Sequence, residues 1–150
     1  STPGAQVLTV VGLNLERIDF DDPSSEKGFS SMKALGRWQW AMQVYAREWN
    51  AHEAVPMNVF MPGLVKTKIL ANEPQPMRLI VQLANVFVGI SVERSARELA
   101  QVIDQSTNDR LRDVYFSRTT LKPPRNLKDQ PGDQPRIWES THRWLAEWLG

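Results

Sequence analysis

The sequence contains no cysteine, which excludes disulfide bonds, thiolate nucleophiles and cysteine metal ligands. It has almost no net charge, with 18 Lys and Arg against 17 Asp and Glu, so nothing electrostatic favours nucleic acid or an anionic membrane surface. The most apolar stretch, residues 77–90, is too short and too often interrupted to span a bilayer. The first residues lack the pattern of a signal peptide. We therefore expect a cytoplasmic protein without a nucleic-acid partner or a membrane span.

The remaining composition is that of a soluble globular protein, with 41% hydrophobic and 23% charged residues. A length of 150 residues favours one domain, 1–150. The two histidines lie far apart, and no grouping of His, Asp or Glu has metal-ligand spacing. We predict no metal site.

Apolar periodicity predicts three strands and four helices. The strands are expected at 7–11, 57–61 and 113–117, and the helices at 30–50, 77–87, 92–105 and 137–149. Residues 13–28 are polar and indicate a loop, and 122–136 are rich in proline and indicate an irregular segment. A strand, a long helix and a second strand indicate a parallel βαβ unit with a right-handed crossover. The order of elements predicts an α/β fold with a small parallel sheet.

Two short motifs carry a resemblance to a known family. The first runs from Gly28 through Phe29 to Lys33 and Ala34 at the start of the long helix, and the second is the segment 58–67, Asn-Val-Phe-Met-Pro-Gly-Leu-Val-Lys-Thr. They resemble the Tyr-x-x-x-Lys helix and the Asn-x-x-x-Pro-Gly-x-x-x-Thr element of the short-chain dehydrogenase/reductase family. Their separation, one long helix and a turn, also fits. The chain is thus similar to the C-terminal half of that partial Rossmann-like, doubly wound fold, with strands five to seven and their flanking helices.

This resemblance implies an NAD(P)-dependent oxidoreductase lineage that binds NAD or NADP. The catalytic tyrosine of the family donates a proton to the carbonyl oxygen, and a lysine four residues later, on the same helix face, lowers its pKa and binds the nicotinamide ribose. Lys33 would be that lysine. The implied cofactor-binding residues are Lys33, Pro62, Gly63, Val65 and Thr67. The segment 64–90 would be the substrate lid, and its apolar residues favour an apolar alcohol or carbonyl.

The sequence departs from the family pattern in three places. Phe29 stands at the tyrosine position and has no proton to give. The position of the family's serine, near Val11 or Gly12, holds no hydroxyl. The eight glycines are not spaced to form the turn that binds the pyrophosphate. We therefore expect no activity from this chain alone, and a second polypeptide or a cleaved N-terminal half that supplies the missing strands.

Two classes of function stay open. The first is the oxidoreductase lineage, in which another polypeptide completes the fold. The second is a non-catalytic pseudoenzyme or partner subunit that retains only the fold and its interfaces. Each motif also has a purely structural interpretation, since Lys33 suits a helix surface and Pro62-Gly63 is a common turn.

Two surfaces are predicted to make contacts with other chains. The strand at 7–11 should form a bare edge of the sheet, which is an aggregation hazard unless another strand covers it. On the helix at 30–50, the stripe of Met32, Leu35, Trp38, Met42, Tyr45 and Trp49 is expected to face the sheet. Trp40 and Val44 lie off that stripe and predict a contact within a homo- or hetero-oligomer, because tryptophan is enriched at interface hot spots.

Overall fold

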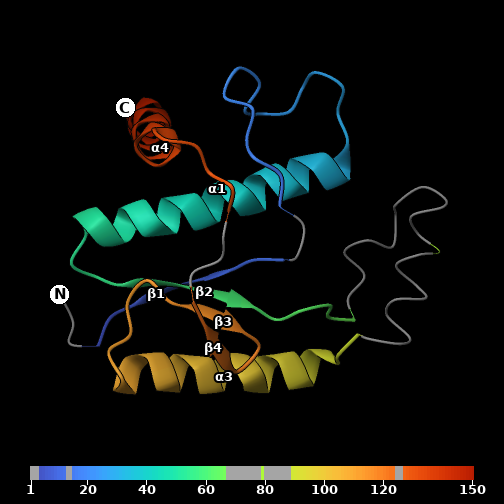
Figure 1. Cartoon of the computed structure of the whole chain (residues 1–150), viewed down its shortest axis with the longest axis vertical. Helices are drawn as coiled ribbons and strands as arrows, with labels where there is room; N and C mark the ends of the chain where they lie inside the picture. The colour runs from blue at the N-terminus through green and yellow to red at the C-terminus, as the bar shows by residue number, and fades with distance from the viewer. Residues whose placement is uncertain (1–3, 13–14, 67–78, 80–88, 124–126) are drawn as a thin grey trace.

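A computed structural model describes residues 4–12, 15–66, 79, 89–123 and 127–150. Its sheet lies between helical layers, with α1 on one face and α3 on the other (Figure 1). In chain order the elements are β1 (Val7–Val10), α1 (Ser31–His52), β2 (Met57–Met61), α3 (Val92–Asn108), β3 (Tyr115–Ser117), β4 (Thr120–Lys122) and α4 (Asp133–Leu149). All but one residue of the predicted helix at 77–87 and most of the predicted lid at 64–90 lie outside the described residues.

The sheet has the order β1-β2-β3-β4. Strands β1, β2 and β3 are parallel, which confirms the α/β class, and Val7 pairs with Met57 while Val59 pairs with Tyr115. The expectation of a wholly parallel sheet is wrong, because β4 returns antiparallel to β3. The reversal takes place within two residues, and Arg118 in that turn has a φ of 55°. A strand of three residues is too short for its alternation to be visible in the sequence.

The two helical layers pack on alternate side chains of β2. Val59 belongs to a cluster with Ala46 of α1, whereas Phe60 packs with Val102 of α3. Both crossovers therefore advance across the sheet in the same direction but on opposite faces (Figure 1). Two such crossovers must differ in hand, so one of them belongs to the rare left-handed kind.

Trp40 and Val44 are not an intermolecular surface, and that prediction is wrong. Trp40 is 1% exposed, and both residues form a core cluster with Ile18 and Leu127. The indole Nε1 of Trp40 also donates a hydrogen bond to the Leu127 carbonyl at 2.8 Å. The segment predicted as a solvated loop folds back over α1 and covers this face, because Ile18 reaches into the core.

The sheet-facing side of α1 also differs from the predicted stripe. Gln39 and Gln43 are buried beneath the helix together with Ala46. Met42, Tyr45 and Trp49 pack only at the margin of the sheet-facing cluster, and Trp38 is exposed. The side-chain amides of Gln39 and Gln43 thus occupy the face of α1 that packs on the sheet, and the aromatic side chains of α1 lie toward the edge of that face or outside it.

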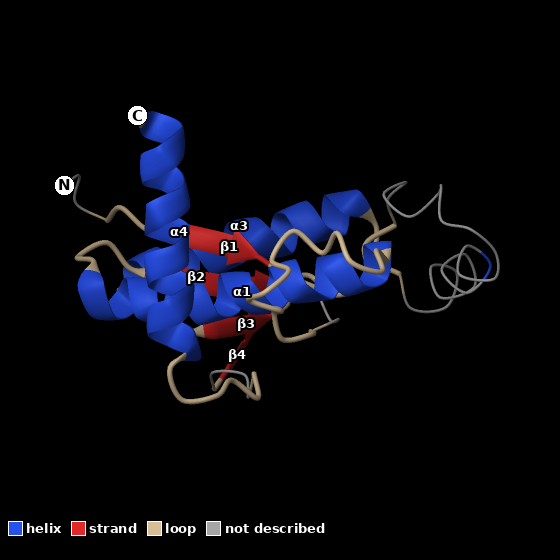
Figure 2. Ribbon diagram, turned by 90° about the horizontal axis from the view of Figure 1, so that it is seen from above, coloured by secondary structure: helices blue, strands red, loops and turns tan. Residues whose placement is uncertain are grey.

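Helix α4 begins four residues earlier than predicted, so the irregular segment predicted at 122–136 is shorter than expected. Asp133 opens the helix, and Pro135 fits its first turn, where a backbone donor is not needed. The helix crosses α1, and its C-terminal part projects beyond the rest of the molecule (Figure 2). At the crossing, Trp138 stacks on Tyr45 with ring centroids 5.3 Å apart and on His52 at 4.7 Å.

Candidate functional site

The residues predicted to bind a cofactor come from the carboxyl ends of neighbouring parallel strands. Lys33 lies in the first turn of α1, which follows β1, and Pro62-Gly63 directly follows β2. Because β1 and β2 are parallel, both positions lie at the same end of the sheet (Figure 1). Ligands of open α/β sheets bind at this end.

Phe29 does not share a helix face with Lys33, unlike the tyrosine and lysine of the family pattern. Helix α1 begins at Ser31, and Ser30 precedes it in an extended conformation with φ −144°. Phe29 therefore lies outside the helix, where its side chain is 69% exposed. The four-residue spacing of the motif does not bring the two side chains together as it would within a helix.

Lys33 is accessible to a ligand. Its Nζ lies 3.9 Å from Glu16 Oε1, and both side chains are substantially exposed. An exposed ion pair of this length contributes little to stability. The ammonium group can therefore exchange Glu16 for another acceptor at small cost.

The Pro62-Gly63 turn presents backbone rather than a side chain. Gly63 has a φ of 81°, in the left-handed region, and a Cβ built on it would meet nothing within 4 Å. Glycine is thus required by the backbone conformation, and the space above it is open. Next to the turn, Val65 forms a parallel bridge with Ile90, where the Lys66 amide donates to the Ile90 carbonyl at 2.9 Å. Thr67 lies outside the described residues.

The side chain of Gln39 occupies the space next to Gly12, near the end of β1, where the family pattern has a serine. The Gly12 amide donates to Gln39 Oε1 at 3.0 Å. A Cβ at Gly12 would lie 2.8 Å from both terminal atoms of the Gln39 side chain. A serine at this position would require Gln39 to move, so the glycine and the glutamine depend on each other. The sequence motif holds no sign of this contact.

Neither tyrosine of the chain replaces the missing proton donor. Tyr115 is the first residue of β3, at the amino end of the strand, and belongs to the core. Tyr45 lies near the middle of α1, and burial raises the pKa of its hydroxyl. Both lie away from the carboxyl end of the sheet that holds Lys33 and Gly63.

The acidic loop before α1 is organised around Arg37, a residue that the sequence analysis did not select. The guanidinium of Arg37 lies 3.7 to 3.8 Å from carboxylate oxygens of Glu16, Asp19 and Asp22. It also donates to Ser25 Oγ at 3.1 Å. Glu16 is shared between this largely buried cation and Lys33, so the cluster joins the loop to α1 and links it to the candidate cofactor lysine.

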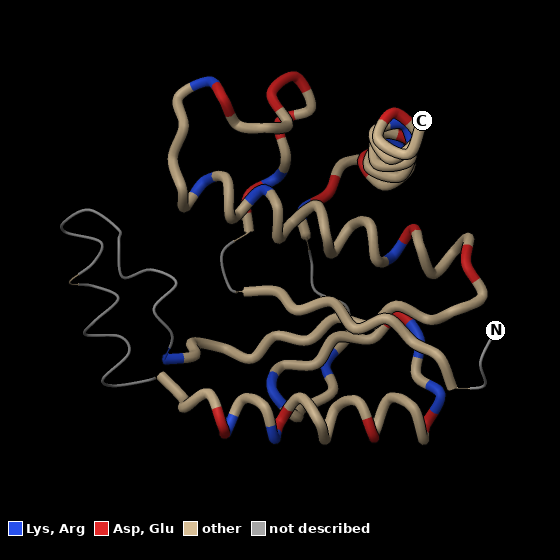
Figure 3. The backbone as a smooth tube through the Cα atoms, turned by 180° about the vertical axis from the view of Figure 1, so that it is seen from behind, with Lys and Arg blue, Asp and Glu red and all other residues tan. Residues whose placement is uncertain are grey.

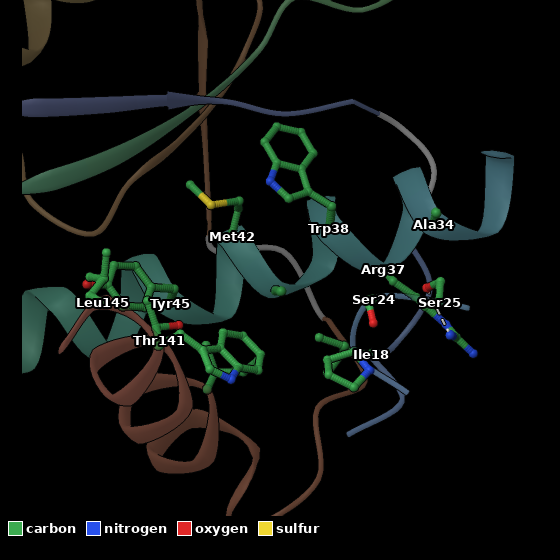
Figure 4. Close-up of a pocket in the computed structure, with 14 residues that line it drawn as sticks. Ile18, Ser24, Ser25, Ala34, Arg37, Trp38, Met42, Tyr45, Thr141 and Leu145 are labelled. Carbon is green, nitrogen blue, oxygen red and sulfur yellow. Dashed lines mark hydrogen bonds between the residues drawn. The ribbon is translucent and has the colours of Figure 1, made fainter. Parts of the chain in front are cut away.

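A pocket of about 780 Å³ lies between this loop, α1 and α4 (Figure 4). Trp38, Met42 and Tyr45 of α1 and Thr141 and Leu145 of α4 are among its lining residues, and Tyr45 lies beside Thr141 and Leu145 (Figure 4). The remaining lining residues are Ile18, Pro23, Ser24, Ser25, Ala34, Arg37, Ala41, Ile137 and Trp144. The pocket depends on the crossing of two helices with 80 residues between them in the chain, so sequence periodicity did not predict it.

Comparison with known proteins adds no assignment: no family model, no curated protein and no solved structure matches the chain. Among the described residues, Lys and Arg positions are interspersed with Asp and Glu positions along the backbone (Figure 3). In the same part of the chain, no helix has both the length and the apolar character needed to cross a bilayer. The assignment of function therefore depends on the site itself.

Proposed function

We propose that this chain forms the C-terminal half of a short-chain-dehydrogenase-like domain, from a lineage of NAD(P)-dependent oxidoreductases that act on an apolar alcohol or carbonyl. The observation that carries the proposal is the common location of Lys33 and the Pro62-Gly63 turn at the carboxyl end of β1 and β2. In this role Lys33 binds the ribose hydroxyls next to nicotinamide. The bare backbone at Gly63 accepts the flat face of the nicotinamide ring.

The proposal assigns no hydride transfer to the chain alone. Phe29 cannot donate a proton, and positioned acid–base catalysis contributes about 10²–10⁴-fold to such reactions. The glycines are also not spaced for a pyrophosphate-binding turn. The chain therefore supplies the nicotinamide side of a cofactor site, and the other side belongs to residues contributed by another polypeptide segment.

The test uses reduced nicotinamide mononucleotide, which carries the nicotinamide and ribose that Lys33 and Gly63 would contact together with one phosphate, and lacks the adenosine half of the cofactor. We expect its fluorescence to change on titration with the chain at millimolar concentrations, with no turnover of carbonyl substrates. Lys33→Ala should weaken binding about tenfold, and Lys27→Ala, a nearby exposed lysine, should leave it unchanged. Competition by adenosine diphosphate, or unchanged binding by Lys33→Ala, would contradict the proposal.

A second candidate function is a non-catalytic partner subunit, which the free edge of β1 favours. The amides of Val7 and Val11 donate to carbonyls of Pro56 and Phe60, so the alternate residues of the strand direct their amides away from β2. Because β1 is the outermost strand in the part of the chain that the structure describes, Leu8 and Val10 present their backbone donors and acceptors on the side away from β2. Another strand can pair at this edge whether the chain is half of an oxidoreductase domain or a non-catalytic partner subunit. In the first case, the edge is where the other half of the domain would join.

Blocking that edge should reduce association. We expect the chain to form species larger than a dimer as its concentration rises, and Val10→Pro to remove them. Proline at Val10 takes away an outward-facing amide and leaves the bonds to β2 intact. Light scattering over a concentration series measures the effect, with Val92→Pro, an exposed position at the start of α3, as the control. Equal scattering by wild type and Val10→Pro would show that the edge does not pair.

A further inference from the structure

The pocket over α1 has walls that are anchored in the core. The loop before α1 and helix α4 both lie on the side of α1 opposite the sheet, and the pocket lies between them (Figure 1). Ile18 of the loop and Ile137 of α4 line it, and they are only 7% and 4% exposed. Both belong to the cluster around Trp40. The pocket is therefore fixed by the same contacts that hold the helical layer together.

The wall formed by the loop is also held by hydrogen bonds. Asp22 is 7% exposed and accepts from the amides of Glu26 and Lys27 at 2.9 and 3.1 Å. Arg37 of α1 donates to Ser25 Oγ at 3.1 Å, which ties the loop to the helix. A wall fixed in this way loses little conformational freedom when a ligand binds, and such preorganisation favours affinity.

The lining offers no uncompensated charge to a ligand. Among the described residues, Arg37 is the one charged residue that lines the pocket. Its guanidinium lies 3.7 to 3.8 Å from the carboxylates of Glu16, Asp19 and Asp22, so its charge is compensated within the protein. An ionised ligand would have to leave water without a free partner of opposite charge, which is costly. The lining therefore selects an uncharged molecule.

Two hydroxyl groups provide polar contacts in this apolar lining. Tyr45 of α1 lies beside Thr141 of α4 (Figure 4). Within the part of the chain that the structure describes, neither hydroxyl makes a hydrogen bond and neither oxygen is fully buried. Burial raises the pKa of Tyr45 above its ordinary value, so its hydroxyl stays protonated at neutral pH. The pair can thus donate to a carbonyl oxygen, or donate to and accept from a hydroxyl.

We infer that this pocket binds a small uncharged molecule with an apolar body and a single carbonyl or hydroxyl group. The body packs against Met42, Trp144 and Leu145, and the polar group bonds to Tyr45 and Thr141. The volume of about 780 Å³ lies within the roughly 300–1,000 Å³ of pockets that bury most of a small ligand. The loop and α4 bound the pocket on opposite sides, which suits a compact ligand rather than an added strand or helix.

This site is separate from the proposed cofactor site. Lys33 and Gly63 lie at the carboxyl end of the sheet and are not among the lining residues of the pocket. Occupation of the pocket therefore does not depend on a nicotinamide cofactor, and each site can be tested without the other.

Binding of prodan, an uncharged naphthalene that carries one ketone, tests the site in the full chain. We expect its emission to shift to shorter wavelength and to saturate at one probe per chain. Tyr45→Phe and Thr141→Val each remove one hydroxyl and keep nearly the same side-chain shape. Each should weaken binding about three- to tenfold, the loss expected for one hydrogen bond.

Two tryptophans of α4 provide a matched pair of variants. Trp144 and Trp148 are 41% and 89% exposed, and only Trp144 lines the pocket. Trp144→Ala should weaken prodan binding about tenfold, because it removes apolar contact area from the site. Trp148→Ala should leave binding unchanged. Circular dichroism checks that both variants keep the fold.

Competition against prodan tests the chemical class of the ligand. Acetonaphthone, an uncharged ketone, should displace the probe, whereas naphthoate, an anion of similar size, should require at least about tenfold higher concentrations. Lys33→Ala should bind prodan like wild type, so failure of the cofactor site and failure of this site are distinguishable.

Four results would overturn the inference. They are binding without saturation, equal effects of Trp144→Ala and Trp148→Ala, unchanged binding in both hydroxyl variants, and displacement by naphthoate at the same concentration as acetonaphthone. A prodan affinity that falls as the chain concentration rises would assign the pocket to a second copy and would equally contradict a small-molecule site.

Discussion

Replacement of Trp40 by alanine is expected to lower the free energy of unfolding by about 3–5 kcal/mol. The side chain is fully buried against Ile18, Leu127 and Ile137, and its indole nitrogen satisfies the Leu127 carbonyl. Truncation would leave a cavity and a buried acceptor without its donor. Trp40 joins the α1 helix to segments from both ends of the chain, so the loss affects the whole α1–α4 layer.

Urea denaturation followed by far-UV circular dichroism measures this effect without depending on tryptophan fluorescence. Phe29→Ala is the matched control, because Phe29 is an exposed aromatic residue near the start of the same helix. The control should change stability by less than about 0.5 kcal/mol. Equal midpoints for Trp40→Ala and wild type would mean that the layer over α1 is not formed as described.

Replacement of Asp133 by asparagine is expected to cost about 1–3 kcal/mol at neutral pH. Asp133 is buried at the start of α4 and accepts hydrogen bonds from Arg17 Nε at 2.7 Å and from the Gln130 amide at 2.7 Å. The Arg17 guanidinium binds both of its oxygens. This contact fixes the loop before α1 to the first turn of α4, so its loss should loosen both.

The same substitution should alter the response to acid. The hydrogen bond from Arg17 holds the pKa of Asp133 below its ordinary value. Because this pKa is lowered, the ionised Asp133 stabilises the folded protein fully above the pKa that the group has in the unfolded state, near pH 4. This stabilisation is lost as the pH falls through the pKa of Asp133 in the folded state. The difference between wild type and Asp133→Asn should therefore shrink from neutral pH to about pH 2. Urea midpoints at both pH values measure it, and a constant difference would exclude this ion pair as the cause.

The elements that the sequence predicted correctly are those with their own apolar signal. The strands at β1 and β2 are short apolar runs, and α1 and α3 each repeat apolar residues at helical spacing. Ile18 illustrates what such signals miss. It is an apolar residue between Arg17 and Asp19 in a segment without helical or strand periodicity, and only the folded chain shows that it packs with Trp40. The error at the Trp40 surface follows directly from that omission.

The sequence predicted those residues of the candidate site that directly follow a strand or begin the helix after it. Lys33 and Gly63 lie at one end of the sheet because parallel strands end together. The predicted helix at 30–50 already left Phe29 outside, and the helix begins one residue later, at Ser31, because Ser30 is extended. The contact of Gln39 with Gly12 and the carboxylates around Arg37 bring together residues from different elements, for which the sequence carries no periodic sign.

The measurement that tests the central claim most directly is a backbone amide NMR titration of the chain with reduced nicotinamide mononucleotide. We predict chemical-shift changes concentrated at Lys33, Gly63 and Val65, absent in Lys33→Ala and not reproduced by adenosine diphosphate. Saturation without shifts at these amides, or shifts centred on another part of the molecule, would contradict the assignment of a nicotinamide half-site to this end of the sheet.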